Sequence, residues 1–381
     1  MTTALSMAEL HRATLARQLL LERAPLTVPD AVRRVYGMQA QHAASPYLAL
    51  WNRVADFDPA EADRAFTDAT VVKSSLMRIT LHAVHAEDLP ATWTALQPTL
   101  RSARLGDRRF TQTGLTIAQA DQLIPELLPH LDQPRSGAEL EERIAEVSGV
   151  AGKWVWWALR TYGPFRHAPV GPPWSFGWRP VFVASGLPPT PYDPEASDLA
   201  LRHLVRRYLA AFGPASIADV AQFALVQRAR VRAAVTALEP ELRRFTGPDG
   251  VRLVDVADGP LPLAETPAPP RLLPMWESTL LAYADRTRVL PERYRKVVIR
   301  SNGDVLPSLL VEGRVAGVWR STGAGIEVTA FHHLPEPVWE QVEAEAAGLR
   351  DLLAPREVEV YSRYHHWWSR LPEGETRVLS R

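Results

Sequence analysis

The sequence predicts a mainly helical α+β protein made of three similar helical units and a β-rich C-terminal part. In three places a hydroxyl side chain precedes a short amphipathic helix, and these hydroxyls belong to Thr27, Ser136 and Ser216. Such a side chain can cap the helix by accepting a backbone hydrogen bond. Each short helix also follows a longer amphipathic one. At 381 residues the chain is too long for one small core, so several modules are expected.

The helices of the three units are expected in a fixed order. The long helices are predicted over 7–21, 117–131 and 199–212. In the first unit the short helix spans 27–37, with Thr27 as its cap, Pro29 in its first turn and Gly37 suited to the left-handed position after it. A further helix is predicted in the second and third units, over 153–162 and 226–238.

Strand-forming sequence closes each unit. The second unit has a predicted strand at 179–185, and the third has a hairpin with Pro248-Asp249-Gly250 at its tip. In the first unit the hairpin candidate is 71–84, displaced by helical sequence from 59 to 66. Three helices followed by a hairpin form a winged helix. Winged helices in tandem favour nucleic-acid binding, and docking of a protein partner is the alternative.

A proline-rich stretch from 260 to 270 separates these units from the last third of the chain. Beyond it we predict a strand-rich segment over 295–329 and an amphipathic helix over 337–353. The three winged-helix units are predicted over 1–110, 111–195 and 196–260, and the C-terminal α/β segment, with its hairpin, over 270–381.

The C-terminal segment contains the clearest hairpin signal. Ser301-Asn302-Gly303-Asp304 lies between the β-branched run 297–299 and Val305, and Asn-Gly accepts the positive φ angles of a type I′ turn. The tip is polar and Arg300 flanks it. An ordinary surface hairpin is the alternative to a DNA-contacting one.

Two glutamines, Gln39 and Gln41, follow the helix that ends near Gly37. Residues i and i+2 diverge around a helix but share a face in extended backbone. After Gly37 the two amides can therefore converge on one point, where they can hold a water molecule.

Composition restricts the function further. The 43 Lys+Arg balance 43 Asp+Glu, and with three lysines the chain has forty arginines. Arginine suits bidentate contact with phosphate. Basic residues cluster in four sets: Arg101, Arg104, Arg108, Arg109; Arg202, Arg206, Arg207; Arg228, Arg230, Arg232; and Arg286, Arg288, Arg293, Arg295, Lys296, Arg300. These sets indicate a basic face on a neutral protein, or else solvated helix faces with their own ion pairs.

Several other classes are disfavoured. The chain has no cysteine, no long apolar run and no signal peptide, so a cytoplasmic protein without disulfides is expected. Adjacent histidines such as His332-His333 and His365-His366 point apart and lack partners for a metal site, so neither metal nor cofactor is predicted. Trp154 and Trp157 share a helix face that we assign to the core, which leaves Trp156 as the candidate for base stacking.

Several motifs together resemble the AlkZ/YcaQ family of winged-helix DNA glycosylases. They are Met38-Gln39-Ala40-Gln41, Ser45-Pro46-Tyr47, Trp51-Asn52-Arg53, the run from Leu76 to His82, Leu273-Pro274-Met275-Trp276-Glu277, the run from Gly303 to Pro307, and the run from Gly313 to Arg320. The resemblance implies tandem winged helices in a C-shaped arrangement. It assigns catalysis to Gln39 and Gln41, the Gln-x-Gln version associated with bulky alkylguanines and interstrand crosslinks.

The resemblance also implies DNA contacts. Arg78, Thr80 and His82 lie in the motif of the first wing. His82 is expected to orient a catalytic side chain or to contact phosphate, and Arg78 to clamp the DNA backbone near the lesion. The alternative for these residues is structural, holding the wing against the helix that carries the glutamines. Arg53 is expected to hold a phosphate. The family's minor-groove hairpin is assigned to the tip with Arg300 and Asn302. Glu277 stands where the family often has aspartate, which leaves its role open.

The chemistry follows from the amides. N7-alkylguanine is cationic, so its glycosidic bond is weak, and an amide pair can orient water toward C1′ without being a strong base. Lys73 is assigned to DNA contact and not to lyase chemistry, so the product is an abasic site. The prediction is a monomeric, monofunctional DNA glycosylase that acts on duplex DNA with alkylated or crosslinked purines, in self-resistance to a DNA-alkylating natural product. A winged-helix transcription regulator and a DNA-independent scaffold are the alternatives.

Overall fold

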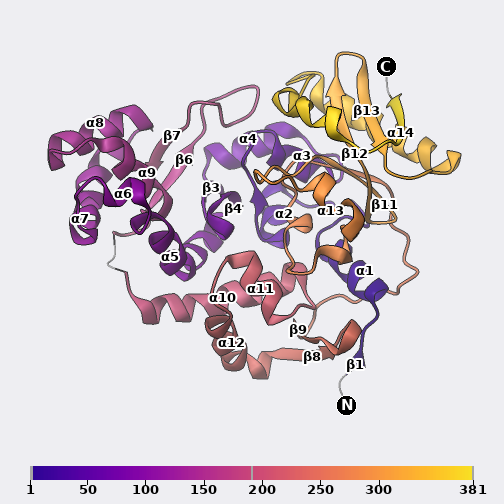
Figure 1. Ribbon diagram of the computed structural model, residues 1–381, viewed down its shortest axis with the longest axis horizontal. Helices are drawn as coiled ribbons and strands as arrows, with labels where there is room; N and C mark the ends of the chain where they lie inside the picture. The colour runs from indigo at the N-terminus through magenta and orange to yellow at the C-terminus, as the bar shows by residue number, and fades with distance from the viewer. Residues whose placement is uncertain (1–2, 190–191, 380–381) are drawn as a thin grey trace.

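The computed structural model describes residues 3–189 and 192–379 and confirms a mainly helical α+β protein. Figure 1 shows the second unit at the left, the third unit below, and the C-terminal sheet at the upper right, placed around the first unit. Among the described residues, no helix combines the length and apolar composition needed to cross a bilayer.

The first unit begins with β1 and α1 and ends with a two-stranded wing. Ser6 caps α1 in a capping box with Glu9, and Thr27 caps α2 by accepting from the Asp30 amide. The helix α1 ends at Arg17, four residues earlier than expected. The elements are β1 (Thr3–Ala4), α1 (Met7–Arg17), α2 (Val28–Val35), β2 (Met38–Gln39), α3 (Ser45–Trp51), α4 (Pro59–Thr67), β3 (Val71–Ser75) and β4 (Leu81–His85).

The second unit follows two connecting helices, α5 (Leu89–Leu105) and α6 (Arg108–Thr111). Its elements are α7 (Ile117–Leu127), β5 (Arg135–Ser136), α8 (Gly137–Ser148), α9 (Gly152–Tyr162), β6 (Phe165–Ala168) and β7 (Val181–Ala184). The short strand β5 pairs with β7, and β6 pairs with β7 as the wing. Ser136 caps α8 with Glu139 as the reciprocal partner.

The third unit repeats this order. Its elements are α10 (Pro194–Phe212), α11 (Ile217–Ala224), α12 (Arg228–Ala237), β8 (Leu242–Thr246) and β9 (Arg252–Val256). Ala215 forms an isolated bridge with Val254, in the place that β5 occupies in the second unit. The N-terminal strand β1 extends the wing by pairing with β8 in parallel.

One sheet joins the first two units. Its strand order is β2-β4-β3-β6-β7-β5, so the two wings form a continuous six-stranded sheet. The junction is the pairing of Lys73 on β3 with His167 on β6. The predicted division at residue 110 therefore falls between two parts of one sheet.

The C-terminal part packs on the first unit. A shared apolar core contains Val32 and Leu48 of the first unit together with Leu272, Trp319 and Trp339 of the C-terminal part. The elements are β10 (Arg271–Leu273), α13 (Glu292–Val298), β11 (Ser308–Val311), β12 (Arg314–Thr322), β13 (Gly325–Ala330), α14 (Glu336–Leu353) and β14 (Glu375–Leu379). The strands form one antiparallel sheet in the order β10-β11-β12-β13-β14.

The predicted strand before the Asn-Gly turn is wrong. Residues up to Val298 belong to α13, and a single bridge from Ile299 to Val305 replaces the expected ladder. Tyr294 and Val298 are buried on the inner face of α13, so tertiary packing overrides the β preference of the valine run. The Gly303 amide donates to Arg300, and Gly303 has φ +91°, as in a three-residue loop with a bulge.

Candidate active site

The two glutamines lie at the edge of the six-stranded sheet. Helix α2 ends where Tyr36 and Gly37 take positive φ angles, and β2 then pairs with β4 so that Gln39 faces His82. The pairing continues past β2, because the Ala40 amide donates to the Leu81 carbonyl at 2.7 Å. A Cβ at position 37 would lie 3.1 Å from the Met77 side chain, so the turn favours glycine for space as well as conformation.

The first wing holds both amides by their carbonyl oxygens. Gln39 is 5% exposed, and its Oε1 accepts from Arg78 Nη2 at 2.8 Å. Gln41 is exposed, and its Oε1 accepts from the Leu81 amide at 2.8 Å. Arg78 lies in the turn between β3 and β4, and Leu81 is the first residue of β4. Each carbonyl oxygen has a second lone pair, so both can accept one further hydrogen bond.

Arg78 and His82 form the support of Gln39. His82 is fully buried, with Nδ1 3.1 Å from the Thr80 carbonyl and Nε2 3.2 Å from Arg78 Nη2. Burial and the neighbouring guanidinium keep the pKa of His82 well below its usual value. The ring is therefore neutral, donates from Nδ1 and accepts from Arg78. The structure places His82 as an orienting residue and leaves it no exposed atom for a phosphate, which corrects the DNA-contact alternative.

Arg78 is half-buried in the wing turn, where its φ is +55°. Its guanidinium lies 5.3 Å from the centroid of the Phe223 ring and donates to the Phe223 carbonyl. Burial lowers the pKa of Arg78 to about 10, so it remains a cation at neutral pH. The half-buried Thr80 donates its hydroxyl to the Met77 carbonyl and so closes the turn.

Lys73 is buried, which differs from the expected DNA contact. Its side chain is 5% exposed and its ammonium lies 4.6 Å from the centroid of the Phe176 ring. Among the described residues no carboxylate pairs with it. Burial lowers its pKa to about 8. Since the ammonium is enclosed by the sheet and the Phe176 ring, it does not present a charge to a phosphate backbone.

The expected phosphate contact of Arg53 is also wrong. Arg53 is 1% exposed and Glu277 is 2% exposed, and their charged groups meet at 2.7 Å. Burial alone would raise the pKa of Glu277, but Arg53 and the Thr279 hydrogen bonds hold it below its usual value. This pair ties α3 to the C-terminal part, which gives Glu277 a structural role.

The adjacent Ser278 supports the glutamine strand, and sequence reasoning missed it. Its hydroxyl accepts a hydrogen bond from the backbone N–H of Gln39 at 3.2 Å and donates one to the Gly37 carbonyl at 3.3 Å. Nothing in its local sequence signals this contact, because Ser278 and Gln39 are 239 positions apart.

The loop 301–303 connects to the same region. Ser301, Asn302 and Gly303 are exposed, and Asn302 donates to the Asp304 carboxylate at 2.9 Å. Trp276 donates to the Gly303 carbonyl, two residues before the serine that contacts Gln39. Arg300 is half-buried, and its guanidinium lies 4.9 Å from the centroid of the Trp367 ring. The exposed tip with Asn302 thus remains available for DNA, while Arg300 is packed behind it.

The four basic sets are partly neutralised by ion pairs. Each set has at least one arginine in such a pair, and the pairs are Arg101–Asp121, Arg109–Asp107, Arg206–Glu241, Arg207–Asp88, Arg230–Asp198 and Arg295–Glu292. The solvated-face interpretation therefore holds for part of each set. Within the described ranges no cluster of three or more acidic or histidine side chains is arranged to hold a metal ion.

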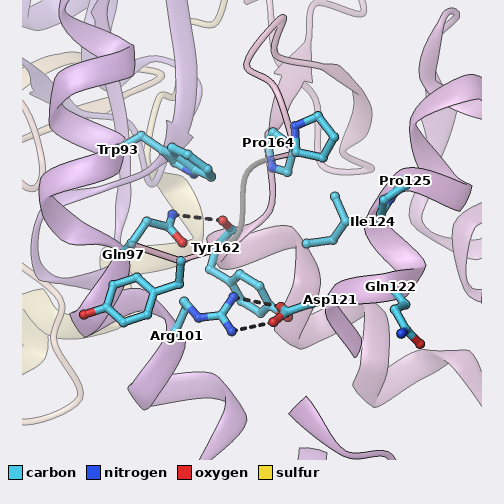
Figure 2. A pocket seen from close by; sticks show the side chains of 11 residues that line it. Trp93, Gln97, Arg101, Asp121, Gln122, Ile124, Pro125, Tyr162 and Pro164 are labelled. Carbon is cyan, nitrogen blue, oxygen red and sulfur yellow. Dashed lines mark hydrogen bonds and ion pairs between the residues drawn. The ribbon is translucent and has the colours of Figure 1, made fainter. Parts of the chain in front are cut away.

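Two other features are distinct from the glutamines. Trp156 is 1% exposed and belongs to the core, whereas Trp154 is exposed, so the predicted stacking role of Trp156 is wrong. A cavity of about 240 Å³ lies between α5 and α7. The Arg101–Asp121 pair lies on one side of it (Figure 2). Its lining includes none of the predicted site residues.

Comparison with known proteins places these features in context. The family model described as DNA glycosylase AlkZ-like matches residues 32–352. An interstrand DNA cross-link repair glycosylase of Streptomyces sahachiroi is 26% identical over 372 residues, which cover 87% of this chain and 92% of that protein. The solved structure of the DNA glycosylase AlkZ of Streptomyces sahachiroi is similar in fold, with a TM-score of 0.75 and 24% identity, over 91% of this chain and 96% of that one.

Proposed function

This chain belongs to the AlkZ-like DNA glycosylase family, and we propose that it hydrolyses the N-glycosidic bond of cationic N7-alkylguanine and N3-alkyladenine in duplex DNA. Membership of a DNA glycosylase family favours a glycosylase over the alternative of a winged-helix transcription regulator. The observation that carries the substrate class is the character of the glutamine site. Among the described residues, the hydrogen-bond partners of Gln39 and Gln41 include an arginine, a serine and backbone groups but no carboxylate.

The proposed mechanism uses the two amides to place a water molecule. Base release passes through an oxocarbenium-like sugar, and the water must approach C1′ on the face opposite the leaving base. Arg78 and the Leu81 amide fix the two carbonyl oxygens, so each keeps one lone pair in a defined direction. Amides are weak bases, so the reaction relies on a leaving group that is already cationic.

We propose that the enzyme is monofunctional and leaves an abasic site. A lyase would need an accessible amine that attacks C1′. Lys73 lies on β3, which β4 separates from the glutamine-bearing strand β2. Its ammonium is enclosed over the Phe176 ring. Bulky adducts and interstrand crosslinks are included in the proposal, as is self-resistance to a DNA-alkylating natural product. The support for crosslinks is the name of the similar Streptomyces sahachiroi protein.

The substrate range tests this proposal. The protein is expected to release 7-methylguanine and 3-methyladenine but neither 1,N6-ethenoadenine nor 8-oxoguanine, because only the first two leave as neutral bases from a cationic nucleotide. Single-lesion duplexes are incubated with protein, and abasic sites are revealed by heat- or base-induced strand cleavage. The Gln41→Asp variant should stay active on 7-methylguanine, since a carboxylate can also orient water and stabilise the oxocarbenium. Efficient removal of 8-oxoguanine by the unmodified protein, or a folded but inactive Gln41→Asp variant, would contradict the water-positioning role.

Salt dependence tests the basic sets. Affinity for undamaged duplex should fall with salt with a log–log slope of roughly 0.9 per phosphate contacted, because each contact releases condensed counterions. Fluorescence anisotropy with labelled duplex at several salt concentrations measures the slope. The Arg202→Ala variant should reduce it by about one unit if Arg202 contacts a phosphate. A flat salt dependence would mean that the basic sets do not track the DNA backbone.

A further inference from the structure

The long loop between β6 and β7 does not project from the second wing but folds back on the first unit and the C-terminal part. Trp174 donates to the Glu357 carboxylate, and the Ser175 amide donates to the Tyr47 hydroxyl at 3.1 Å. Phe176 packs edge-on against Phe66, with ring centroids 4.8 Å apart. Three consecutive residues therefore anchor the loop, and Trp178 follows two positions after the last of them.

The anchored loop presents Trp178 to solvent beside His42, the residue after Gln41. Trp178 is 70% exposed, although residues 174–176 of the same loop are buried, and so large an exposed apolar surface is unusual for a tryptophan. Its indole packs edge-on against the buried His42 ring, with ring centroids 5.6 Å apart and planes at 84°. His42 directly follows Gln41 in the chain. The exposed indole thus contacts the residue that directly follows Gln41 in the chain.

The surroundings of Trp178 combine aromatic and cationic groups. The Arg363 guanidinium lies 4.8 Å from the Trp178 ring centroid and 4.9 Å from that of Tyr364. Tyr364 packs edge-on against Trp276, which holds the loop 301–303 through the Gly303 carbonyl. A continuous row of rings therefore runs from Trp178 past His42 and Tyr364 to the exposed 301–303 tip.

We propose that Trp178 is a stacking surface for a planar aromatic group that the lesion displaces from the duplex. The proposal rests on the proposed function. Arg363 covers one face of the indole, and the large exposed fraction leaves π surface for a second ring. Aromatic side chains beside cationic ones recognise unstacked rings in this way, largely independently of sequence. The ring is either a nucleobase at the lesion or the aromatic part of a bulky adduct, and both offer the same π surface.

Binding to uncleavable lesions tests the proposal separately from hydrolysis. Duplexes carry the 2′-fluoro derivative of 7-methyl-2′-deoxyguanosine or of 7-benzyl-2′-deoxyguanosine, because the fluorine makes the glycosidic bond resist hydrolysis. An undamaged duplex serves as the reference. Anisotropy gives Kd for the unmodified protein, Trp178→Ala, Trp178→Phe and the control Trp154→Ala, which removes an exposed tryptophan on α9. Trp178→Ala should weaken binding to lesion duplex roughly tenfold, the scale of one lost base stack. Trp178→Phe and Trp154→Ala should stay within about twofold of the unmodified protein, since both keep a ring at position 178.

The two lesions distinguish the source of the ring. Equal weakening by Trp178→Ala on both lesions identifies a nucleobase, and weakening on the benzyl lesion alone identifies the adduct. The proposal is overturned if Trp178→Ala binds both lesion duplexes as tightly as the unmodified protein, if undamaged duplex is weakened equally, or if Trp178→Phe loses as much as Trp178→Ala. Unchanged lesion binding would point to a protein partner for this surface. Selective, Trp178-dependent binding without release of 7-methylguanine would refute the proposed hydrolysis alone.

Discussion

Replacing Gln39 or Gln41 with alanine is expected to slow release of 7-methylguanine roughly a hundredfold or more, the scale of a lost acid/base or water-positioning group. Gln41→Ala removes the exposed amide, and Gln39→Ala removes the acceptor of the Arg78 guanidinium. Affinity for duplex should change little, because both amides act on the water and not on phosphate. Single-turnover rates with excess protein, together with Kd for undamaged duplex, measure the two effects separately.

A matched control comes from a glutamine elsewhere. Gln122 is exposed on α7 and lines the cavity of Figure 2, so Gln122→Ala removes the same chemical group away from β2. Its rate should equal that of the unmodified protein. Unaltered rates in both Gln39→Ala and Gln41→Ala would refute their catalytic assignment.

A large effect on stability is expected from the buried pair of Arg53 and Glu277. Glu277→Ala should lower the free energy of unfolding by about 3–5 kcal/mol, because it leaves the Arg53 cation buried without its carboxylate. Urea denaturation followed by far-UV circular dichroism measures the change. The control is Glu146→Ala, which breaks the largely exposed pair with Arg143 and should cost less than about 1 kcal/mol.

The pair also has a defined pH dependence. The pKa of Glu277 is lower in the folded protein than its ordinary value of 4.5, so the unfolded chain binds the proton more readily. The stabilisation is therefore complete above the ordinary pKa and is lost as the pH falls through the lowered one. A Glu277→Ala variant as stable as the unmodified protein would show that the buried pair has no net structural role.

Local sequence signals were sufficient for the strand that carries the glutamines. Thr27, Pro29 and Gly37 predicted the start and end of α2, and the extended pairing of Gln39 follows from where that helix ends. The hydroxyl caps Ser136 and Ser216 likewise identified α8 and α11. At these three helix starts the capping hydrogen bonds join residues three positions apart, so the local sequence contains the signal for where each helix begins. The pairing of Gln39 with His82 on β4 is not local.

Residues whose environment is set by distant segments were predicted less well. Arg53 resembles a surface arginine until Glu277, 224 positions away, provides its partner. On α9 the spacing of Trp154 and Trp157 correctly grouped the two rings, but it could not tell which face of the helix was buried. Trp178 offered no local signal, because its position beside His42 depends on a loop from the second unit folding onto the first.

In the sheet shared by the first two wings, β3 is synthesised well before its neighbouring strand β6. Until β6 has left the ribosome, β3 is an edge strand with unpaired backbone groups, and such an edge is a template for aggregation. A fragment cut at residue 110 retains that open edge permanently. We therefore expect the first two units to melt in a single cooperative transition, and neither to be separable by proteolysis or truncation as a soluble module.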